Sequence, residues 1–244
     1  MTLLETQGLS KNFGGVQAVR AVDFSLASGE IRAVIGPNGA GKTTFVGAIC
    51  GRLRPTAGRV LFKGRDITRR TAWQRAGDGI VYTFQITSVF QNLTCRDNVA
   101  LAVQRPLMRG IAGRIHLAPE AMRAAVAAAL ERVGLAGEAD RVASTLPYGH
   151  QRLLEVAMGL ALSPELLIMD EPTQGLSETE VEGFCRLTRA IAGETTVLLI
   201  EHNMAVVMEL ADRITVMDNG AVLAEGTPAE ISADADVQRA YLGT

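Results

Sequence analysis

The sequence has no hydrophobic run long enough to cross a bilayer. The best candidate, residues 153–169, is interrupted by Glu155, Pro164 and Glu165, whereas a membrane-spanning helix needs about 20 predominantly apolar residues. The start of the chain, MTLLETQGLS, contains an early acidic residue and no apolar core of signal-peptide length. We therefore expect a cytoplasmic protein that reaches a membrane only through a partner.

Cysteine is scarce, and neither sign of charge dominates. Cys50, Cys95 and Cys185 lie far apart and form no Cys-x-x-Cys pair, so we expect buried small hydrophobic residues in a reducing compartment. The chain has 24 basic and 26 acidic residues and a formal net charge of −2, without a long block of one sign. This balance argues against nucleic acid as the main partner.

The first third of the chain alternates apolar segments with turn residues. Its 244 residues, 48% of them hydrophobic, fit one large domain or one domain with an inserted lobe. The short apolar runs 31–35 and 59–62 predict buried strands. Between them, apolar residues recur at helical spacing from Phe45 to Leu53, and we expect the following Pro55 and Gly58 to end that helix.

The middle of the chain, from about residue 87 to 146, has little β pattern. Residues 121–133 are rich in alanine, and Gly134 follows as a predicted helix stop. The segment 105–116 is basic and contains one proline and two glycines, which predicts an exposed loop. We interpret this region as a helical lobe inserted into an α/β core.

The last third returns to alternating strands and helices. Residues 166–169 and 196–200 are apolar runs that predict strands. Ser177 and Glu180 form a capping box, which predicts the start of a helix that buries Val181, Phe184, Leu187 and Ile191. Asn219-Gly220 between two apolar runs predicts a β-hairpin. Strands that alternate with helices indicate a largely parallel sheet.

The decisive motif matches the pattern G-x-x-x-x-G-K-[ST], with a predicted strand before it and a predicted helix after it. Its residues are Gly36, Pro37, Asn38, Gly39, Ala40, Gly41, Lys42, Thr43 and Thr44. The glycines let successive amides face one anion, and the helix N-terminus adds its dipole. We expect Lys42 to pair with the β- and γ-phosphates and the Thr43 hydroxyl to bind Mg²⁺.

Two acidic residues follow the predicted strand 166–169. A Ras-type GTPase would need Asn-Lys-x-Asp and Asp-x-x-Gly, and neither string occurs in the chain. Asp170 and Glu171 instead end an apolar strand, and buried carboxylates are costly unless they meet a cation. We expect Asp170 to hold Mg²⁺ through water and Glu171 to polarise the attacking water.

Three further residues are candidates with weaker local support. His202 follows a predicted strand and could contact the γ-phosphate, although a histidine at a strand end is usually a surface residue. Gln85 lies where the helical lobe begins and could sense the γ-phosphate and Mg²⁺. Phe13 precedes Gly14-Gly15 and could stack on adenine, as aromatic residues stack on bases, or could belong to the core.

In this order the motifs resemble the ATP-binding subunits of ABC transporters over essentially the whole chain. The resemblance implies a P-loop NTPase: a RecA-like core with an antiparallel β subdomain (1–85 and 156–244) and a helical subdomain (86–155) in one domain, 1–244. It assigns adenine stacking to Phe13 and coupling to the transmembrane subunit to Gln85. Residues 146–151 match the family fingerprint, in which Gly149 faces nucleotide, and residues 175–177 match the loop at the dimer seam.

The resemblance also implies partners. Two such subunits pack head to tail around two ATP molecules, each beneath the other's fingerprint, and permease subunits connect them to a solute receptor. Two positions depart from the pattern, because Pro147 replaces the fingerprint serine and His150 replaces a glutamine. We therefore expect the composite site completed by this fingerprint to be the weaker of the two.

Segments in the C-terminal part of the chain resemble one particular group of ABC transporters. The segments 198–204, 212–217, 223–228 and 240–243 look like importers of branched-chain amino acids, and the long link after Gln85 resembles the longer of their two ATPases. A second, shorter ATPase is then the expected partner, and a second copy of this chain is the alternative. The alternatives are the ATPase of lipopolysaccharide export, a soluble ABC ATPase that acts on DNA or ribosomes, and a scaffold that does not hydrolyse ATP.

Overall fold

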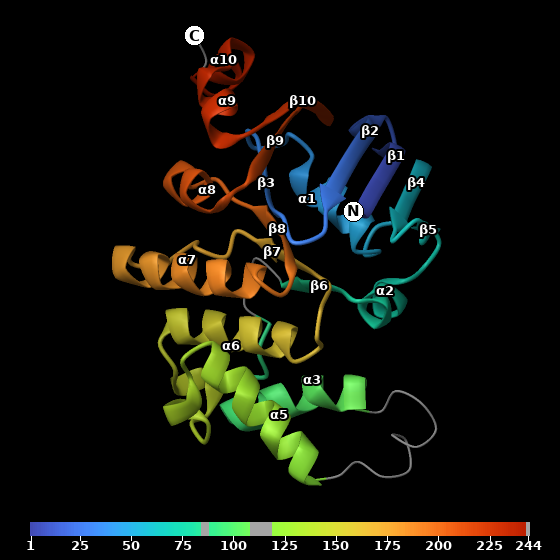
Figure 1. Cartoon of the computed structure of the whole chain (residues 1–244). Helices are drawn as coiled ribbons and strands as arrows, with labels where there is room; N and C mark the ends of the chain where they lie inside the picture. The colour runs from blue at the N-terminus through green and yellow to red at the C-terminus, as the bar shows by residue number, and fades with distance from the viewer. Residues whose placement is uncertain (84–87, 108–118, 243–244) are drawn as a thin grey trace.

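Two sheets and a helical lobe make up the part of the chain that the structure, a computed structural model, describes: residues 1–83, 88–107 and 119–242 (Figure 1). One sheet is antiparallel, with strand order β2-β1-β4-β5. Its strands are β1 (Thr2–Phe13), β2 (Val16–Ala27), β4 (Ala57–Phe62) and β5 (Arg65–Asp66). This sheet matches the antiparallel subdomain that the resemblance implied.

The second sheet has the order β10-β9-β3-β8-β7-β6 and is parallel apart from β10. Its strands are β3 (Ile31–Ile35), β6 (Ile80–Thr83), β7 (Leu166–Asp170), β8 (Thr196–Ile200), β9 (Arg213–Asp218) and β10 (Ala221–Gly226). Every residue of β3, β7 and β8 is buried, as expected for central parallel strands covered on both faces. The predicted parallel sheet is thus confirmed.

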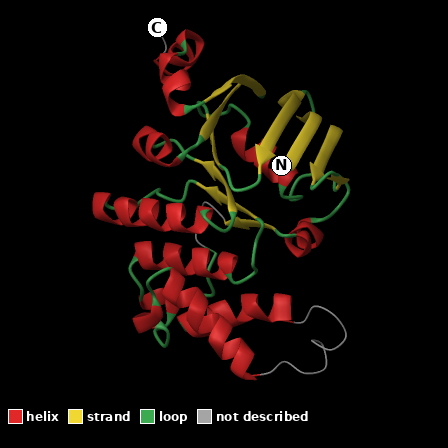
Figure 2. Cartoon of the chain, viewed as in Figure 1, coloured by secondary structure: helices red, strands yellow, loops and turns green. Residues whose placement is uncertain are grey.

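Alternate residues of the central strands supply two cores. Ile168, Leu198 and Ile200 pack with α1 (Lys42–Ile49) and the antiparallel sheet. Leu167 and Leu199 pack on the opposite face with the helical lobe and α7 (Glu178–Ala192). In Figure 2 the parallel sheet accordingly lies between helices on one side and the antiparallel sheet on the other.

Helices form the lobe at the lower end of Figure 1. They are α3 (Cys95–Leu107), α5 (Pro119–Arg132) and α6 (Tyr148–Leu160). The remaining helices border the two sheets and are α2 (Ala72–Asp78), α8 (Met204–Leu210), α9 (Pro228–Ala233) and α10 (Ala235–Leu242). No helix in the described ranges is both long and apolar enough to span a bilayer.

Several element boundaries differ from the predictions. Helix α1 ends at Ile49, well before Pro55, because Gly51 adopts a left-handed conformation and turns the chain. Leu53 still covers Gly47 after this turn, which preserves the helical spacing that misled the prediction. Likewise, α3 continues to Leu107, so the predicted loop 105–116 is wrong for its first three residues; the rest of it lies outside the described residues.

Other local predictions are confirmed. The Ser177–Glu180 capping box is present, and Gly134 has a positive φ just beyond α5. Asn219 and Gly220 both have positive φ, as a tight hairpin turn requires. All three cysteines are buried and free. Helix α7 buries Phe184 and Ile191 as predicted, whereas Val181 and Leu187 are only half-buried.

Candidate nucleotide site

Glycines let the loop between β3 and α1 turn tightly against its neighbours. Gly36, Gly39 and Gly41 all have positive φ, a conformation that side chains disfavour. A Cβ on Gly36 would lie 2.1 Å from the Met217 carbonyl oxygen, and one on Gly41 would lie 2.3 Å from that of Ala18. Backbone therefore packs directly on backbone at both ends of the loop.

The β9–β10 hairpin braces this loop from the side. The Gly220 amide donates to the Ala40 carbonyl at 3.0 Å, and the Gly220 carbonyl accepts from the Arg20 amide at 2.7 Å. The loop is thereby fixed to β2 and to a hairpin about 180 residues away in sequence. The sequence predicted this hairpin but not its contact with the loop, because no local pattern encodes such a contact.

Lys42 lies inside the curve of the loop. Its ammonium donates to the carbonyls of Gly36 at 2.7 Å and Pro37 at 3.0 Å. Burial lowers the pKa of Lys42 from its ordinary value, while the charges of Glu171 and Asp170 raise it in part. The structure thus brings the predicted lysine and the two predicted acids into one electrostatic neighbourhood.

The first turn of α1 leaves its amides available to a ligand. Helices α2, α7 and α9 begin with capping boxes, and Asn203 caps α8. Within the described residues, no side chain caps α1, whose N-cap residue is Gly41. Its first turn contains Lys42, the exposed Thr43 and the partly exposed Thr44. Uncapped N-terminal amides at the positive end of the helix favour a phosphate.

Asp170 is held by a residue that the sequence reasoning missed. Its side chain is 2% exposed, and its Oδ2 atom accepts from the Tyr82 hydroxyl at 2.5 Å. Burial, followed by this bond to Asp170, raises the pKa of Tyr82 well above its ordinary range. Tyr82 pairs with Ile168 across β6 and β7, a register that a sequence pattern does not reveal.

The donor set here suits a hard divalent cation that is shared with phosphate. Among the described residues, no group of three or more His, Cys, Asp or Glu side chains can hold a metal ion. Asp170 and Thr43 offer oxygen atoms, and Mg²⁺ is commonly bound by one or two protein oxygens together with phosphates and water. These residues therefore fit a Mg²⁺ ion that arrives with a nucleotide.

Glu171 and His202 face each other beyond the strand ends. Glu171 has a φ of 45°, and its amide donates to the Ile200 carbonyl at 2.8 Å. His202 is 59% exposed, and its Nδ1 atom lies 3.9 Å from the Glu171 carboxylate and 3.9 Å from that of Glu201. A positive φ in a residue other than glycine is strained, and such strain is often found at functional sites.

Glu201 is a second residue that the sequence reasoning did not single out. It is fully buried, and its carboxylate accepts from the amides of Thr173 at 3.1 Å, His202 at 2.9 Å and Asn203 at 3.1 Å, and from the Thr173 hydroxyl. These donors satisfy the hydrogen-bonding capacity of a buried carboxylate, as buried polar groups require. Glu201 thus joins the segment after Glu171 to the segment that carries His202.

The predicted fingerprint opens α6 and packs against α7. Pro147 occupies the N-cap position, and no side chain in the described part of the protein caps this helix. A Cβ on Gly149 would lie 2.1 Å from a carboxylate oxygen of Glu180, and one on Gly175 would lie 3.2 Å from the Tyr148 ring. The fingerprint and the predicted dimer-seam loop are therefore in contact within one subunit.

Arg152 connects this helix to the acidic strand end. Its buried guanidinium donates to the carbonyl oxygens of Asp170 at 2.8 Å and Pro172 at 3.2 Å, and to the Glu155 carboxylate at 2.7 Å. The sequence reasoning missed Arg152, because an arginine within an apolar helix gives no sign of its partners. Through this side chain, a shift of α6 would reach the backbone on both sides of Glu171.

Two predicted residues remain apart from this cluster. Phe13 ends β1, is 49% exposed, and lies 4.9 Å from the Lys11 ammonium, measured to the ring centroid; it therefore does not belong to the core. Gln85 lies outside the described residues. The roles expected of both stay predictions.

Known proteins resemble the chain along its full length. A family model described as ABC transporter matches residues 19–174, and one described as branched-chain amino acid ATP-binding cassette transporter matches residues 221–244. The high-affinity branched-chain amino acid transport ATP-binding protein LivG of Salmonella typhimurium is 41% identical over 249 residues, covering 99% of this chain and 98% of its own. BraF of Pseudomonas aeruginosa, with the same description, is 39% identical over 250 residues at the same coverage.

A solved structure agrees with the fold. A nucleotide-free ATP-binding cassette from an ABC transporter matches with a TM-score of 0.88 and 29% identity over the full length of both chains. This likeness confirms the predicted fold class, a P-loop NTPase with parallel and antiparallel sheets.

Proposed function

The chain belongs to the family of ABC transporter ATP-binding subunits, and on that premise we propose that it drives the import of branched-chain amino acids by hydrolysing ATP. The names of LivG and BraF and the family model over residues 221–244 support this substrate class. They favour import over lipopolysaccharide export and over a soluble role on DNA or ribosomes. The single observation that carries the ATPase activity is the electrostatic grouping of Lys42, Asp170 and Glu171 at the phosphate loop.

The mechanism follows from the positions of these side chains. The amides of residues 36–44 and the Lys42 ammonium bind the β- and γ-phosphates. Thr43 and Asp170 would hold Mg²⁺, and the bound ion would supply neutralisation of the phosphate charge. Glu171 orients and polarises the attacking water, and His202 contacts the γ-phosphate. The family resemblance, rather than a described position, supports the last two roles: Phe13 would stack on adenine, and Gln85 would report the nucleotide state to a permease.

We propose a second, shorter ATPase as the partner that completes each site. Gly149 and the uncapped amides of α6 would face the γ-phosphate held by that partner. Permease subunits would carry this pair on the inner face of the plasma membrane, with the solute receptor on the other side. The helical subdomain (86–155) would then move against the core (1–85 and 156–244) when nucleotide closes the pair.

Transport tests this function directly. Deletion of the gene should abolish ATP-dependent uptake of leucine, isoleucine and valine, and the unaltered chain should restore it. The Glu171→Gln chain should be present at equal amounts and fail to restore uptake. If uptake of these amino acids survives deletion while another solute is lost, the proposed substrate class is wrong although the ATPase assignment stands.

A further inference from the structure

Residues 52–75 are far more basic than the rest of the chain. They contain eight of the 24 basic residues and one of the 26 acidic residues. This segment therefore has a formal charge of +7, while the remainder of the chain has −9. Apart from the adjacent Arg69 and Arg70, other residues separate the basic side chains, so the segment does not form a long block of one sign in the sequence.

The fold gathers these arginines around three adjoining hollows. A hollow of about 510 Å³ is lined by Arg59, Arg69 and Arg70, and one of about 390 Å³ by Arg54, Arg69 and Arg70. Arg65 and Arg70 line a third, of about 160 Å³. Because all three share Arg70, they form one continuous surface. We call these five residues, Arg54, Arg59, Arg65, Arg69 and Arg70, the arginine surface.

The backbone beneath the arginine surface is fixed from within. The buried Arg75 donates to the carbonyls of Thr68 at 3.0 Å and Arg70 at 3.1 Å, and it also bonds to the carbonyls of Ala48 and Ile49 at the end of α1. The Thr68 hydroxyl accepts from the Val60 amide at 2.9 Å. The exposed arginines therefore project from a segment that is already ordered without a ligand.

Acidic side chains neutralise little of this charge. Arg70 pairs with Asp78 at 2.9 Å. Hydrogen bonds from Thr68 lower the pKa of Asp66, and the charges of Arg59 and Arg69 add to this effect. Within the described residues, no ion pair is present at Arg54, Arg59, Arg65 or Arg69. A surface of this kind attracts closely spaced phosphates.

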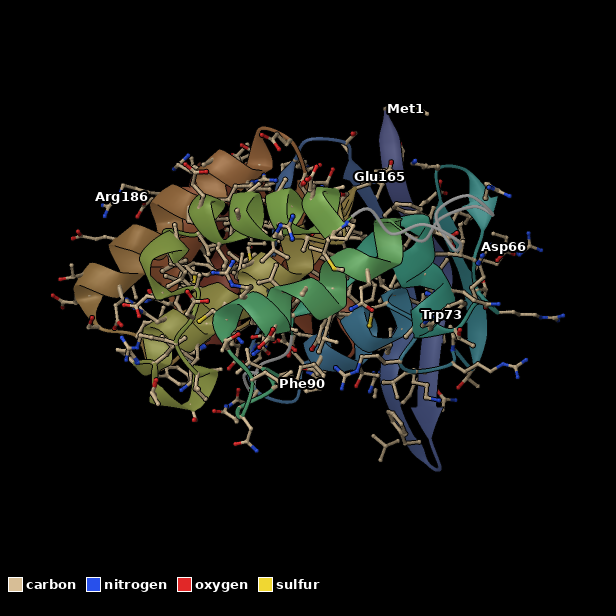
Figure 3. All side chains as sticks on the ribbon, turned by 90° about the horizontal axis from the view of Figure 1, so that it is seen from below. Met1, Asp66, Trp73, Phe90, Glu165 and Arg186 are labelled. Carbon is tan, nitrogen blue, oxygen red and sulfur yellow. The ribbon has the colours of Figure 1, made fainter. Side chains whose placement is uncertain are left out.

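Trp73 indicates which phosphates these are. It is the one tryptophan of the chain, and it is 73% exposed. It lies on α2, two residues after Thr71, which lines the same hollow as Arg69. Figure 3 shows Trp73 and Asp66 at one end of the molecule, far from Arg186. Tryptophan beside basic residues is typical of contact with membrane headgroups, where the indole enters the interface and the cations meet anionic lipid.

We propose that the arginine surface and Trp73 form a contact site for anionic phospholipid headgroups, separate from the nucleotide site. The proposal uses the membrane location given under Proposed function, but the contact requires neither ATP nor a permease. Single-stranded nucleic acid fits less well, because binding of that kind uses several aromatic platforms along a groove, whereas residues 52–75 expose one. The contact would orient the subunit on the membrane surface before or during docking.

Trp73 supplies its own probe. The purified full chain is mixed with vesicles of phosphatidylcholine alone or with 30% phosphatidylglycerol, and tryptophan emission and cosedimentation are recorded. We expect a blue shift and cosedimentation with the anionic vesicles alone, both weakened by raising the salt concentration. Equal binding to both kinds of vesicle, or no binding to either at low salt, would overturn the proposal.

Matched variants locate the contact. The double variant Arg65→Gln/Arg69→Gln should lower partitioning roughly 25-fold, since each basic residue near an anionic surface contributes about fivefold. Arg186→Gln/Arg239→Gln removes the same charge outside residues 52–75 and should change partitioning less than about twofold. An equal loss in both pairs would show a net-charge effect and reject the site.

Further measurements distinguish lipid from other sources of phosphate, and the contact site from the proposed ATPase function. Inorganic phosphate, pyrophosphate and single-stranded RNA, each at the same total phosphate concentration, should bind more weakly than anionic vesicles; tighter binding of any of them rejects the lipid assignment. ATP affinity is measured on every variant without vesicles. If the unaltered chain binds ATP but no vesicles, the contact site is rejected and the proposed function stands. If the unaltered chain does not bind ATP, the proposed function is rejected.

Discussion

The phosphate loop (residues 36–44) and the fingerprint segment (residues 146–151) each lead into a helix without a side-chain cap, but they are built differently. Backbone from β2, β9 and the β9–β10 hairpin surrounds the phosphate loop, and Lys42 and the two acids lie beside it. The fingerprint contacts α7 through Gly149 and Tyr148. The charged side chains beside it are already engaged within this chain, because Glu180 bonds to Ser177 and Arg152 bonds to Glu155.

This difference indicates which steps one chain can perform alone and which need the assembled pair. The phosphate loop has its lysine, metal-binding oxygens and base within one chain, so its variants should act in the isolated subunit. The fingerprint contributes amides to a phosphate held elsewhere, so its variants should act only in the assembled pair. Arg152 joins the halves, because it extends from the fingerprint helix to the carbonyl oxygens of Asp170 and Pro172.

The largest effect should come from Glu171→Gln. Loss of a general base typically lowers a rate by about 10²–10⁴, while the amide keeps the shape of the side chain. ATP turnover should fall by that factor with ATP affinity nearly unchanged, and the variant should accumulate a nucleotide-bound pair with its partner on size exclusion. The control is Glu178→Gln, which makes the same chemical change at an exposed position on α7 and should leave ATP turnover unchanged. A normal rate for Glu171→Gln would remove the base assignment.

Lys42→Ala should abolish useful ATP binding in the isolated chain. Truncating one member of a buried charge pair costs about 2–5 kcal/mol, which weakens affinity on the order of 100-fold or more. Titration with a fluorescent ATP analogue measures the loss. The control Lys63→Ala removes an exposed lysine that pairs with Glu165, and this variant should bind ATP with unchanged affinity. Equal affinity in both variants would contradict the distinction between the two regions.

How much of the site could be predicted differs between these regions. The sequence predicted the phosphate loop, because its glycines, Lys42 and Thr43 are contiguous and local geometry dictates what they bind. It also predicted Asp170 and Glu171, because two acids at the end of a buried strand are costly without a cation. The order of strands in the sheet then brought both motifs to one edge.

The residues that the sequence did not reveal act across long separations. Tyr82 reaches Asp170 through the β6–β7 register, Glu201 ties Thr173 to His202, and Arg152 reaches the strand end from another helix. Each of these three side chains belongs to a common residue type and lies next to apolar residues in the sequence, so no local pattern indicates its role. Helix ends were misjudged for a related reason: at Gly51 a single left-handed residue decided where α1 stops.

Tyr82→Phe sharpens the account of the metal-binding acid. Removing one hydrogen bond to a carboxylate costs about 1.5 kcal/mol or more, so the Mg²⁺ concentration that half-saturates ATP binding should rise about tenfold or more. Affinity for ATP without Mg²⁺ should stay the same, which a purely structural defect would not preserve. Thr83→Val removes the neighbouring hydroxyl on β6 and serves as control. Unequal metal-free affinities would show that Tyr82 supports the fold rather than Asp170.

The smallest effect should come from restoring the fingerprint hydroxyl with Pro147→Ser. Serine at the N-cap of α6 should stabilise the isolated chain by about 1 kcal/mol, visible as a higher melting temperature. In the assembled pair the hydroxyl can also reach the partner's nucleotide, so ATP turnover should rise about twofold, as one added neutral hydrogen bond of roughly 0.5 kcal/mol allows. Thr227→Ala, which removes the cap of α9, tests whether helix stability alone changes turnover. If Pro147→Ser raises stability but leaves turnover of the pair unchanged, the fingerprint departure does not weaken its composite site.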